Sequence, residues 1–215
     1  MKYRNIIFDF DGVLAESVSV KTQAFHNMFK QYGADVASKV VEHHKANGGM
    51  SRYEKFPFYH RQFLNTDLSV EEIGELSDQF SKMVVEGVIN ADEVKGTSWF
   101  LKKYDKRCKY WIVSATPENE IIKIADKRGI GGSFVKIYGS PKKKPVIVKK
   151  ILTDHNISKN ETVFLGDAMS DFEAADKNKI DFMLRSTSEN ASLFNNENIK
   201  RFTDFIELDK ILHKE

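Results

Sequence analysis

The sequence predicts an α/β protein in which a doubly wound, Rossmann-like parallel sheet is interrupted by an all-helical insertion. Residues 6–8 form an apolar run that indicates a buried strand near the start of the chain. Residues 17–88 then show helical spacing, and from Gly96 onwards short apolar strands alternate with helices. Such alternation is typical of a parallel sheet. We therefore expect a discontinuous core domain, residues 1–16 and 89–215, around a helical domain at residues 17–88.

The composition is that of a globular protein with no strong charge bias. The 215 residues include 41% hydrophobic and 30% charged side chains and carry a net charge of +2, a balance that disfavours nucleic acids and membranes as partners but allows a small anionic substrate. The single cysteine, Cys108, cannot form an internal disulfide, and no stretch approaches the roughly 18 apolar residues of a membrane span. With no signal sequence evident, we expect a cytoplasmic protein that is a monomer or a weak homodimer.

Four helical segments are expected in the insertion. The last has the clearest start, because Ser69 followed three residues later by Glu72 forms a capping box. The third is rich in aromatic residues, which we assign to the core rather than to a ligand site, and Pro57 is expected to interrupt it. The expected segments are residues 18–32, 40–48, 53–63 and 69–87.

The other elements follow from the same patterns. Helices are expected at residues 97–104, 118–128, 145–155, 171–177 and 206–212. Further strands are expected at residues 109–113, 134–138, 162–165, 182–184 and 199–202. Because ligands of an open parallel sheet lie beyond the carboxyl ends of its strands, the residues that follow each strand are the candidate site.

Two aspartates follow the first strand. Alternation of side chains lets Asp9 and Asp11 face the same region while Phe10 turns away, and Gly12 allows the chain to turn sharply. Carboxylates at the end of a buried strand are costly to desolvate unless a cation meets them. A pair of turn aspartates is the plain alternative, but the wholly apolar strand directly before them favours a functional site.

The second strand end offers hydroxyl groups. Ser114 and Ala115 follow the strand, and Pro117 then stands in the expected first turn of a helix. The Ser114 hydroxyl could bind an anion. Taken alone, however, a serine ahead of a helix-starting proline is better explained as a helix cap.

Three consecutive lysines, residues 142–144, follow the third strand and precede a helix whose N-terminus favours anions. Lys144 is the best placed to face a site, because Pro145 holds it extended at the mouth of that helix. We expect Lys142 and Lys143 to be solvated.

The fourth strand end carries Gly166 and Asp167, with Asp171 four residues beyond. Asp171 is also a candidate N-cap for the next helix, a role compatible with service at a metal site. Several carboxylates that converge on one sheet edge need a cation, and an all-oxygen ligand set suits Mg²⁺. Mg²⁺ and Lys144 are therefore the expected partners of the two aspartates after the first strand.

In this order, the four stretches resemble the motifs of phosphatases of the haloacid dehalogenase superfamily. Those enzymes carry Asp-x-Asp-Gly, a Ser or Thr after the second core strand, a Lys often followed by Pro, and Gly-Asp-x-x-x-Asp. Each motif is weak alone, but the ordered set is specific and spans the core. The helical insertion directly after the first motif resembles the small cap of the branch that includes phosphoglycolate phosphatase and β-phosphoglucomutase.

The resemblance implies an aspartyl-phosphate mechanism. It makes Asp9 the nucleophile and Asp11 the acid and base that protonates the leaving oxygen and then activates water. Ser114, Ala115 and Lys144 would bind the phosphoryl group, with Lys144 neutralising its charge. The implied Mg²⁺ ligands are Asp9, the backbone carbonyl of Asp11, Asp167 and, directly or through water, Asp171.

Asp11 and Lys21 also help to choose between hydrolysis and the other activities that the resemblance allows. Dehalogenases of the superfamily lack the second aspartate and the metal, so Asp11 disfavours dehalogenation. Mutases of the β-phosphoglucomutase type commonly have a His in the segment that enters the cap, where this chain has Lys21, so hydrolysis is preferred. A catalytically silent phospho-ligand binding module would have no need of Asp11. Two departures from the family pattern, at residues 15–17 and 178–181, affect detail rather than chemistry.

Substrate specificity is expected to lie in the cap, at the loop that ends near Arg52. Lys21 and Arg52 are the candidate contacts. The Arg52 fork could bind a carboxylate, a phosphate or a hydroxyl pair, and it could equally pair with Glu54 or another surface acid. Adjacent His43 and His44 point too far apart on a helix to share a metal, so structural or solvated roles are favoured.

The expected activity is Mg²⁺-dependent hydrolysis of a small phosphorylated metabolite, either a sugar phosphate or a phosphorylated carboxylic acid. The cap is expected to close over the site and exclude water. Its hinges are expected near residues 15–17 and 87–92.

Overall fold

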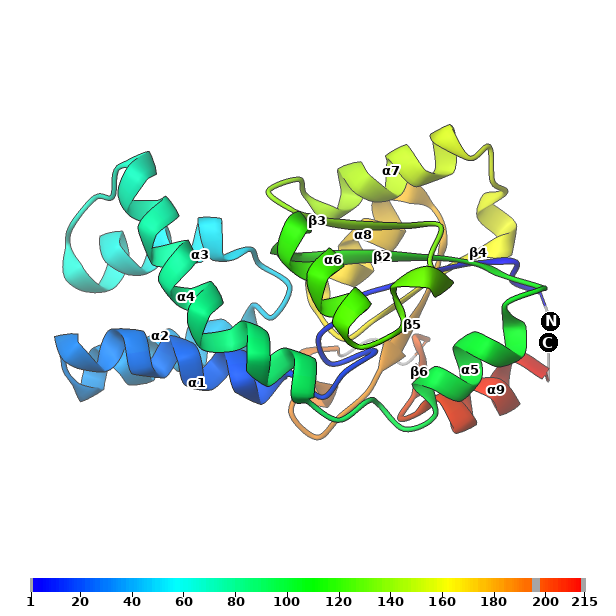
Figure 1. Cartoon of the computed structure of the whole chain (residues 1–215), viewed down its shortest axis with the longest axis horizontal. Coiled ribbons are helices and arrows are strands. Elements are labelled where there is room, and N and C mark those ends of the chain that lie inside the picture. Colours follow the sequence, from blue (N-terminus) through cyan, green and yellow to red (C-terminus); the bar gives the residue numbers. More distant parts are fainter. Residues whose placement is uncertain (1, 195–197, 214–215) are drawn as a thin grey trace.

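The computed structural model describes residues 2–194 and 198–213, and within them six parallel strands form one sheet of order β3-β2-β1-β4-β5-β6 (Figure 1). The predicted doubly wound α/β fold with a helical cap is confirmed. The strand order reverses between β1 and β4, and in an open sheet this is where ligands bind. The strands are β1 Asn5–Phe8, β2 Lys109–Pro117, β3 Lys136–Ser140, β4 Thr162–Gly166, β5 Asp181–Arg185 and β6 Lys200–Phe202.

The register of the central strands sets the height of the site. Phe8, the last residue of β1, lies opposite Ile112 of β2 on one side and Leu165 of β4 on the other. The strand is buried along its length, which explains why its last three residues are all apolar rather than alternating with polar ones. The residues that follow β1 and β4 therefore leave the sheet side by side.

Helices cover both faces of the sheet. Ile7 of β1 packs with one pair of helices, α7 Lys144–Asp154 and α8 Met169–Asn178, in one buried cluster. Ile6 and Phe8 point to the opposite face and pack in a second cluster. The helices on that face are α5 Thr97–Tyr104, α6 Glu118–Lys127 and α9 Phe205–His213.

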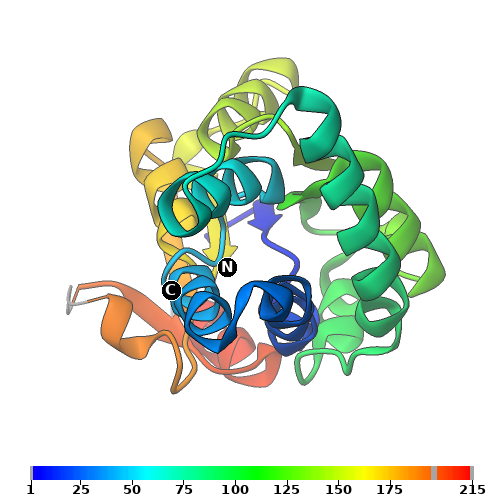
Figure 2. The ribbon, with the colours of Figure 1, turned by 90° about the vertical axis from the view of Figure 1, so that its left-hand side faces the viewer.

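The cap consists of the helices between β1 and α5. They stand beyond the carboxyl ends of the strands, and Figure 2 shows them in front of the sheet with the tip of β1 visible between them. Phe25 and Phe56 lie at the centre of their aromatic core, as predicted. The cap helices are α1 Val18–Phe29, α2 Ala34–Ala46, α3 Arg52–Tyr59, with a π-helical turn at His60–Leu64, and α4 Val70–Asn90.

The start of α4 was predicted correctly, since the Ser69 N–H donates to Glu72 Oε2 at 2.7 Å and the Glu72 N–H to Ser69 Oγ at 3.2 Å. Two other cap predictions were wrong. The second helix begins at Ala34, directly after Gly33, rather than at residue 40. The third runs through Pro57 without interruption, because burial of the neighbouring aromatic side chains outweighs the loss of one helical hydrogen bond.

Three boundaries in the core also differ from the prediction. β2 continues to Pro117 instead of ending at residue 113, and β3 begins at Lys136 instead of residue 134. Helix α8 begins at Met169, so Asp171 lies within its first turn and is not the N-cap. Helix α4 ends at Asn90, three residues beyond the expected end, and α1 ends at Phe29 and is followed by a 3-10 turn at Lys30–Tyr32; the remaining elements start and end within about two residues of the expected bounds.

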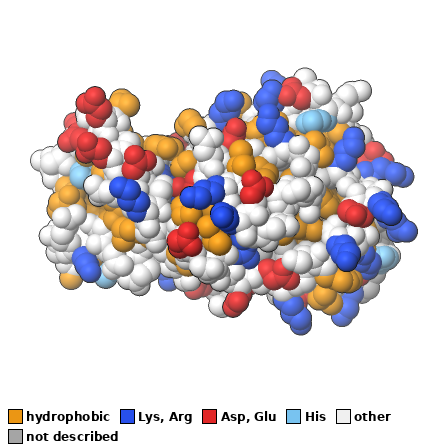
Figure 3. Space-filling view, in the orientation of Figure 1, with side chains coloured by type: hydrophobic (Ala, Val, Ile, Leu, Met, Phe, Trp, Pro, Cys, Tyr) orange, Lys and Arg blue, Asp and Glu red, His pale blue; other side chains and the backbone are white. Residues whose placement is uncertain are grey.

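The surface agrees with the balanced composition. Acidic and basic side chains are interspersed on the face shown in Figure 3, over the cap as well as the core. Among the described helices, none combines the length and the apolar character needed to cross a membrane.

Candidate active site

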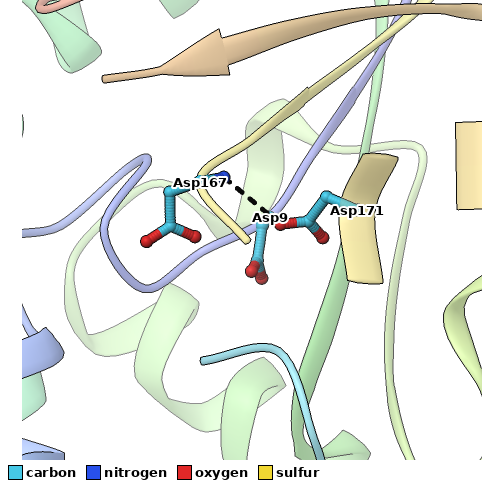
Figure 4. A group of neighbouring side chains, drawn as sticks. All are labelled: Asp9, Asp167 and Asp171. Atoms are coloured by element: carbon cyan, nitrogen blue, oxygen red, sulfur yellow. Dashed lines mark hydrogen bonds between the residues drawn. The ribbon is translucent and has the colours of Figure 1, made fainter. Parts of the chain in front are cut away.

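Three carboxylates meet beyond the ends of β1 and β4. Asp9 directly follows β1, Asp167 directly follows β4, and Asp171 comes from the first turn of α8 (Figure 4). One oxygen from each lies within 4.8 Å of the other two. The sheet topology brings together residues more than 150 positions apart, as the sequence predicted for Asp9 and Asp167.

Lys144, the first residue of α7, neutralises part of this cluster. Its Nζ donates to Asp9 Oδ2 at 2.7 Å and to Asp171 Oδ1 at 2.6 Å, and all three side chains are buried. Asp9 Oδ1 accepts the Phe10 N–H at 2.7 Å. The ammonium and the backbone therefore fix both oxygens of Asp9. Of the three lysines at residues 142–144, the one predicted to face the site does so.

Asp171 orients the loop that follows β4. Its Oδ2 accepts the backbone N–H of Asp167 at 3.2 Å and of Ala168 at 3.0 Å, while its Oδ1 is held by Lys144. A Cβ on Gly166 would lie 2.3 Å from the Asp171 Cβ, so glycine is required where the two segments approach. Both oxygens of Asp171 are engaged, whereas the Asp167 carboxylate points in the same direction as that of Asp9 (Figure 4).

The cluster has too little positive charge to balance its three carboxylates. Burial raises the pKa of Asp9 to about 7, the carboxylates of Asp171 and Asp11 add to this rise, and the Lys144 ammonium opposes it. Burial and the repulsion of Asp9 and Asp171 also raise the pKa of Asp167 well above its usual range. One lysine thus does not balance the acids. A divalent cation would, and an all-oxygen donor set of this kind fits Mg²⁺.

Asp11 lies in a separate network that faces the cap. Its Oδ1 accepts from Ser17 Oγ at 2.6 Å, and its Oδ2 from Lys21 Nζ and from Thr116 Oγ1 at 3.3 Å. Burial alone would raise the pKa of Asp11, but the Lys21 ammonium and the Ser17 hydroxyl outweigh it and hold this pKa below its usual value. Lys21, a predicted substrate contact in the cap, thus reaches across to the core and binds Asp11.

Gly12 keeps the two aspartates close to the β4 loop. Its φ is +75°, and a Cβ at this position would lie 2.3 Å from Asp167 Oδ2. Any larger residue would therefore be strained in the backbone and would collide with a carboxylate of the cluster.

β2 ends in a bulge, and the residue at its end that precedes helix α6 is Pro117, not Ser114. Val113 pairs with Tyr138 and Pro117 with Ser140, so residues 114–116 stand opposite the single residue Gly139. Ser114 Oγ accepts the N–H of Thr116 at 3.1 Å, which leaves its own O–H proton available to a ligand. Ser114 therefore does not cap helix α6, which begins at Glu118, and its role in anion binding stays a prediction.

Two hydroxyl-bearing residues of this region were missed by the sequence analysis. Thr116 contacts Asp11 and also accepts from Lys21 Nζ at 2.7 Å. Ser140, the last residue of β3, has a buried Oγ without a hydrogen-bond partner in the described part of the chain. Both residues lie at strand ends, the same sequence feature that marks Ser114.

Core and cap enclose a cavity of about 670 Å³. Asp9, Asp11 and Ala115 line it from the core, and Lys21 and Arg52 from the cap. Arg52 pairs neither with Glu54 nor with a surface acid. It forms two hydrogen bonds with the Glu120 carboxylate on α6, Nη2 to Oε1 at 2.7 Å and Nη1 to Oε2 at 3.1 Å.

This Arg52–Glu120 pair joins cap to core and is buried, with side-chain exposures of 4% and 8%. Ser81 of α4 also donates to Glu120 Oε2 at 2.5 Å. Glu54 instead pairs with Lys143 across the same junction at 3.1 Å. Nothing in the sequence marks Glu120 as different from the other acids of an amphipathic helix, so this contact could not be predicted.

Sequence comparison assigns the family. A model of the haloacid dehalogenase-like hydrolases matches residues 6–184. The chain belongs to this family. Among curated proteins, none matches it in sequence.

Several solved structures share the fold of this hydrolase over nearly its whole length. A haloacid dehalogenase-like hydrolase from Streptococcus pneumoniae is 19% identical, covers 100% of this chain and 99% of its own, and has a TM-score of 0.71. A predicted phosphoglycolate phosphatase from Haemophilus somnus is 18% identical over 99% of both chains, with a TM-score of 0.73. A proposed β-phosphoglucomutase from Bacteroides vulgatus is 16% identical, covers 98% of this chain and 88% of its own, and has a TM-score of 0.78. At these identities the likeness establishes the shared fold.

Proposed function

We propose that this hydrolase is a Mg²⁺-dependent phosphatase that acts on a small phosphorylated metabolite, a sugar phosphate or a phosphorylated carboxylic acid, through an aspartyl-phosphate. The observation that carries the proposal is the pair of separate networks around the two aspartates. Asp9 is held by Lys144 among carboxylates, and Asp11 is held by Ser17 and Lys21 on the cap side. Neighbouring aspartates in different surroundings suit different chemical roles.

In the first step, an Asp9 oxygen attacks phosphorus and the bond to the leaving oxygen breaks, while a proton passes from the Asp11 carboxyl to that oxygen. In the second step, Asp11 takes a proton from water, the water oxygen attacks phosphorus, and Asp9 is released with phosphate. The lowered pKa keeps Asp11 ionised in the free enzyme, so the proton that it gives to the leaving oxygen must reach it when the substrate binds.

Positive charge is needed for a carboxylate to approach a phosphate. Two like unit charges 4 Å apart repel by roughly 4 kcal/mol at an effective dielectric constant of 20. Lys144 would supply one charge, and the Ser114 hydroxyl and the backbone at Ala115 would hold phosphoryl oxygens. Mg²⁺ would be held by Asp9, Asp167 and the Asp11 carbonyl, with Asp171 acting through Lys144 and the loop backbone. When bound, it would neutralise charge on the phosphoryl group.

The test is phosphate release from a panel of sugar phosphates and phosphorylated acids, with Mg²⁺ and with EDTA. We expect turnover that EDTA abolishes and Mg²⁺ restores. Absence of turnover of every phosphoester by folded, Mg²⁺-loaded protein would refute the phosphatase. A mutase would interconvert sugar phosphates with a bisphosphate primer and release little phosphate. A silent binding module would bind phosphoesters equally well after Asp11→Asn.

The other expectations remain proposals that rest on the sequence. These are a cytoplasmic location, a monomer or weak homodimer, and a cap spanning residues 17–88 that swings on residues 15–17 and 87–92.

A further inference from the structure

Lys55, on helix α3, is a buried lysine in the wall of the active-site cavity. It is 1% exposed, and its Nζ lies 2.7 Å from Nδ1 of His44 and 5.5 Å from the centre of the Phe25 ring. Among the described residues, no carboxylate forms an ion pair with it. A buried ammonium without an anionic partner is costly, so its place beside a cavity calls for an explanation.

The other buried cations around the cavity are matched. Lys21 binds Asp11, Lys144 binds Asp9 and Asp171, and Arg52 is taken up by Glu120. The Arg52 guanidinium was a predicted substrate contact. It cannot bind an anion of the substrate while its ion pair with Glu120 is intact. Among the described residues around the cavity, Lys55 is thus the buried cation that has no carboxylate partner.

The protonation of Lys55 reflects this lack of a partner. Burial lowers the pKa of Lys55 to about 7, and repulsion from the Lys21 ammonium adds to this fall. Attraction to the Asp11 carboxylate opposes it. Burial and the nearby Lys55 charge lower the pKa of His44 to about 2. His44 is therefore neutral, and its Nδ1 accepts a hydrogen bond from Lys55. A second anion in the cavity would stabilise the protonated lysine.

We propose that Lys55, positioned by His44, receives a second anionic group of the substrate, so that the substrate is a phosphomonoester whose leaving alcohol also carries a carboxylate or a phosphate. This inference rests on the proposed phosphatase function and narrows its substrate class. Asp9 and Lys55 line one cavity of about 670 Å³ from the core and the cap respectively, a volume that suits a small metabolite. Phe25 and Phe80 line the same cavity with apolar surface.

The kinetic test compares matched substrates. The carboxylate arm uses 2-phosphoglycolate and 2-phosphoglycolamide, and the phosphate arm uses propane-1,3-diol bisphosphate and 3-hydroxypropyl phosphate. We expect kcat/KM to favour the anionic member of at least one pair, and Lys55→Met to reduce that preference about tenfold or more, as for loss of a charge-assisted hydrogen bond. The arm that responds identifies the anion. The matched control is Lys142→Met, which removes an exposed lysine that lines the same cavity and should leave the preference intact.

A binding test is independent of turnover and of whether Lys55→Met folds. Calorimetry of the wild-type protein near pH 7, in buffers of different ionisation enthalpy, would compare 3-phosphonopropionate with its amide. Because Lys55 has a pKa of about 7, we expect the acid to take up about half a proton more than the amide. The groups that face Lys55 and could contribute are Lys21 on α1, His43 and His44 on α2, and Asp11 after β1.

The outcomes separate this inference from the phosphatase proposal. Turnover with no preference for either anionic substrate, and no extra proton uptake, would overturn the role of Lys55 and leave the phosphatase standing. Binding of 3-phosphonopropionate with extra proton uptake that Lys55→Met abolishes, but without hydrolysis of any phosphoester, would support the anion site and refute the phosphatase.

Discussion

The core wall and the cap wall of the cavity handle charge in opposite ways. The core wall gathers Asp9, Asp167 and Asp171 around the single ammonium of Lys144, and it has too little positive charge. On the cap side, Lys55 has no acidic partner among the described residues. An anionic substrate with a divalent cation would complete both walls together. The comparison teaches that neither wall is electrostatically complete alone, and the predictions below test each wall in turn.

The largest effect is expected on the core wall, at Asp9. Asp9→Asn keeps the shape of the side chain but removes the proposed nucleophile, so phosphate release should fall by at least about a thousandfold. Steady-state phosphate release measures this. The control is Asp176→Asn, which changes an exposed aspartate of α8 that pairs with Lys179. Comparable activity in both variants would mean that Asp9 does not carry the chemistry.

Removal of Lys144 should damage both activity and stability. Lys144→Met leaves Asp9 and Asp171 buried without their cation, and breaking such a buried pair costs about 3–5 kcal/mol of unfolding free energy. Urea unfolding in EDTA measures this cost. The neighbouring Lys143→Met, which changes an exposed lysine, should cost much less. Equal losses would show that the core wall is not short of positive charge.

The contribution of Asp9 and Asp167 to the stability of the metal-free protein should fall as pH rises from about 4 to about 7, while His44, whose pKa is lowered to about 2, works in the opposite direction below about pH 6.5. Burial raises the pKa of Asp9 to about 7 and that of Asp167 well above its usual value, so the folded chain binds more protons than the unfolded chain in this window. Each group contributes a slope of at most roughly 1.4 kcal/mol per pH unit. Asp11, with its lowered pKa, titrates below this window.

Thermal unfolding between pH 5 and pH 8, with EDTA or with Mg²⁺, tests this prediction. A bound cation favours the ionised carboxylates, so the stabilisation by Mg²⁺ should be greater at pH 8 than at pH 5. If the stabilisation by Mg²⁺ were no greater at pH 8 than at pH 5, the charge deficit inferred for the core wall would be wrong.

The smallest effect is expected where the two walls touch. A Cβ on Gly49, in the loop after α2, would lie 1.8 Å from Ser170 Oγ and 3.0 Å from its Cβ, at the start of α8. Gly49→Ala should therefore hinder closure and reduce kcat/KM by a few fold to about tenfold. Gly48→Ala is the matched control, because its nearest contact would be the Ala168 Cβ at 3.7 Å. If both variants behaved alike, contact at this loop would not limit closure.

The core site could be predicted from the sequence because topology alone assembles it. Asp9, Asp167 and Lys144 all lie next to strand or helix ends, and parallel strands bring such ends to one edge whatever the details of packing. Thr116 escaped because the bulge in β2 could not be foreseen, and the bulge decides which hydroxyl faces Asp11.

The cap site could not be predicted in the same way. The partner of Arg52 is an acid on α6, and the partner of Lys55 is a histidine on α2, so each contact depends on how separate helices pack. Helical periodicity identifies the buried face of α3 only through its apolar residues, and Lys55 on that face resembles any surface lysine in the sequence. The structure is needed to show that it is buried.

The Arg52–Glu120 pair also bears on how the cavity opens. A buried, doubly hydrogen-bonded ion pair resists small displacements, because each charge would lose its partner before water could replace it. Once the gap admits water, hydration offsets the lost attraction and further separation costs little. The pair should therefore hold α3 and α6 together until they are far enough apart for water to enter between the two charges. Separation of the cap from the core should therefore be an abrupt event. Because dissolved ions stabilise the separated charges of Arg52 and Glu120, ionic strength should affect how often the cavity opens and releases products.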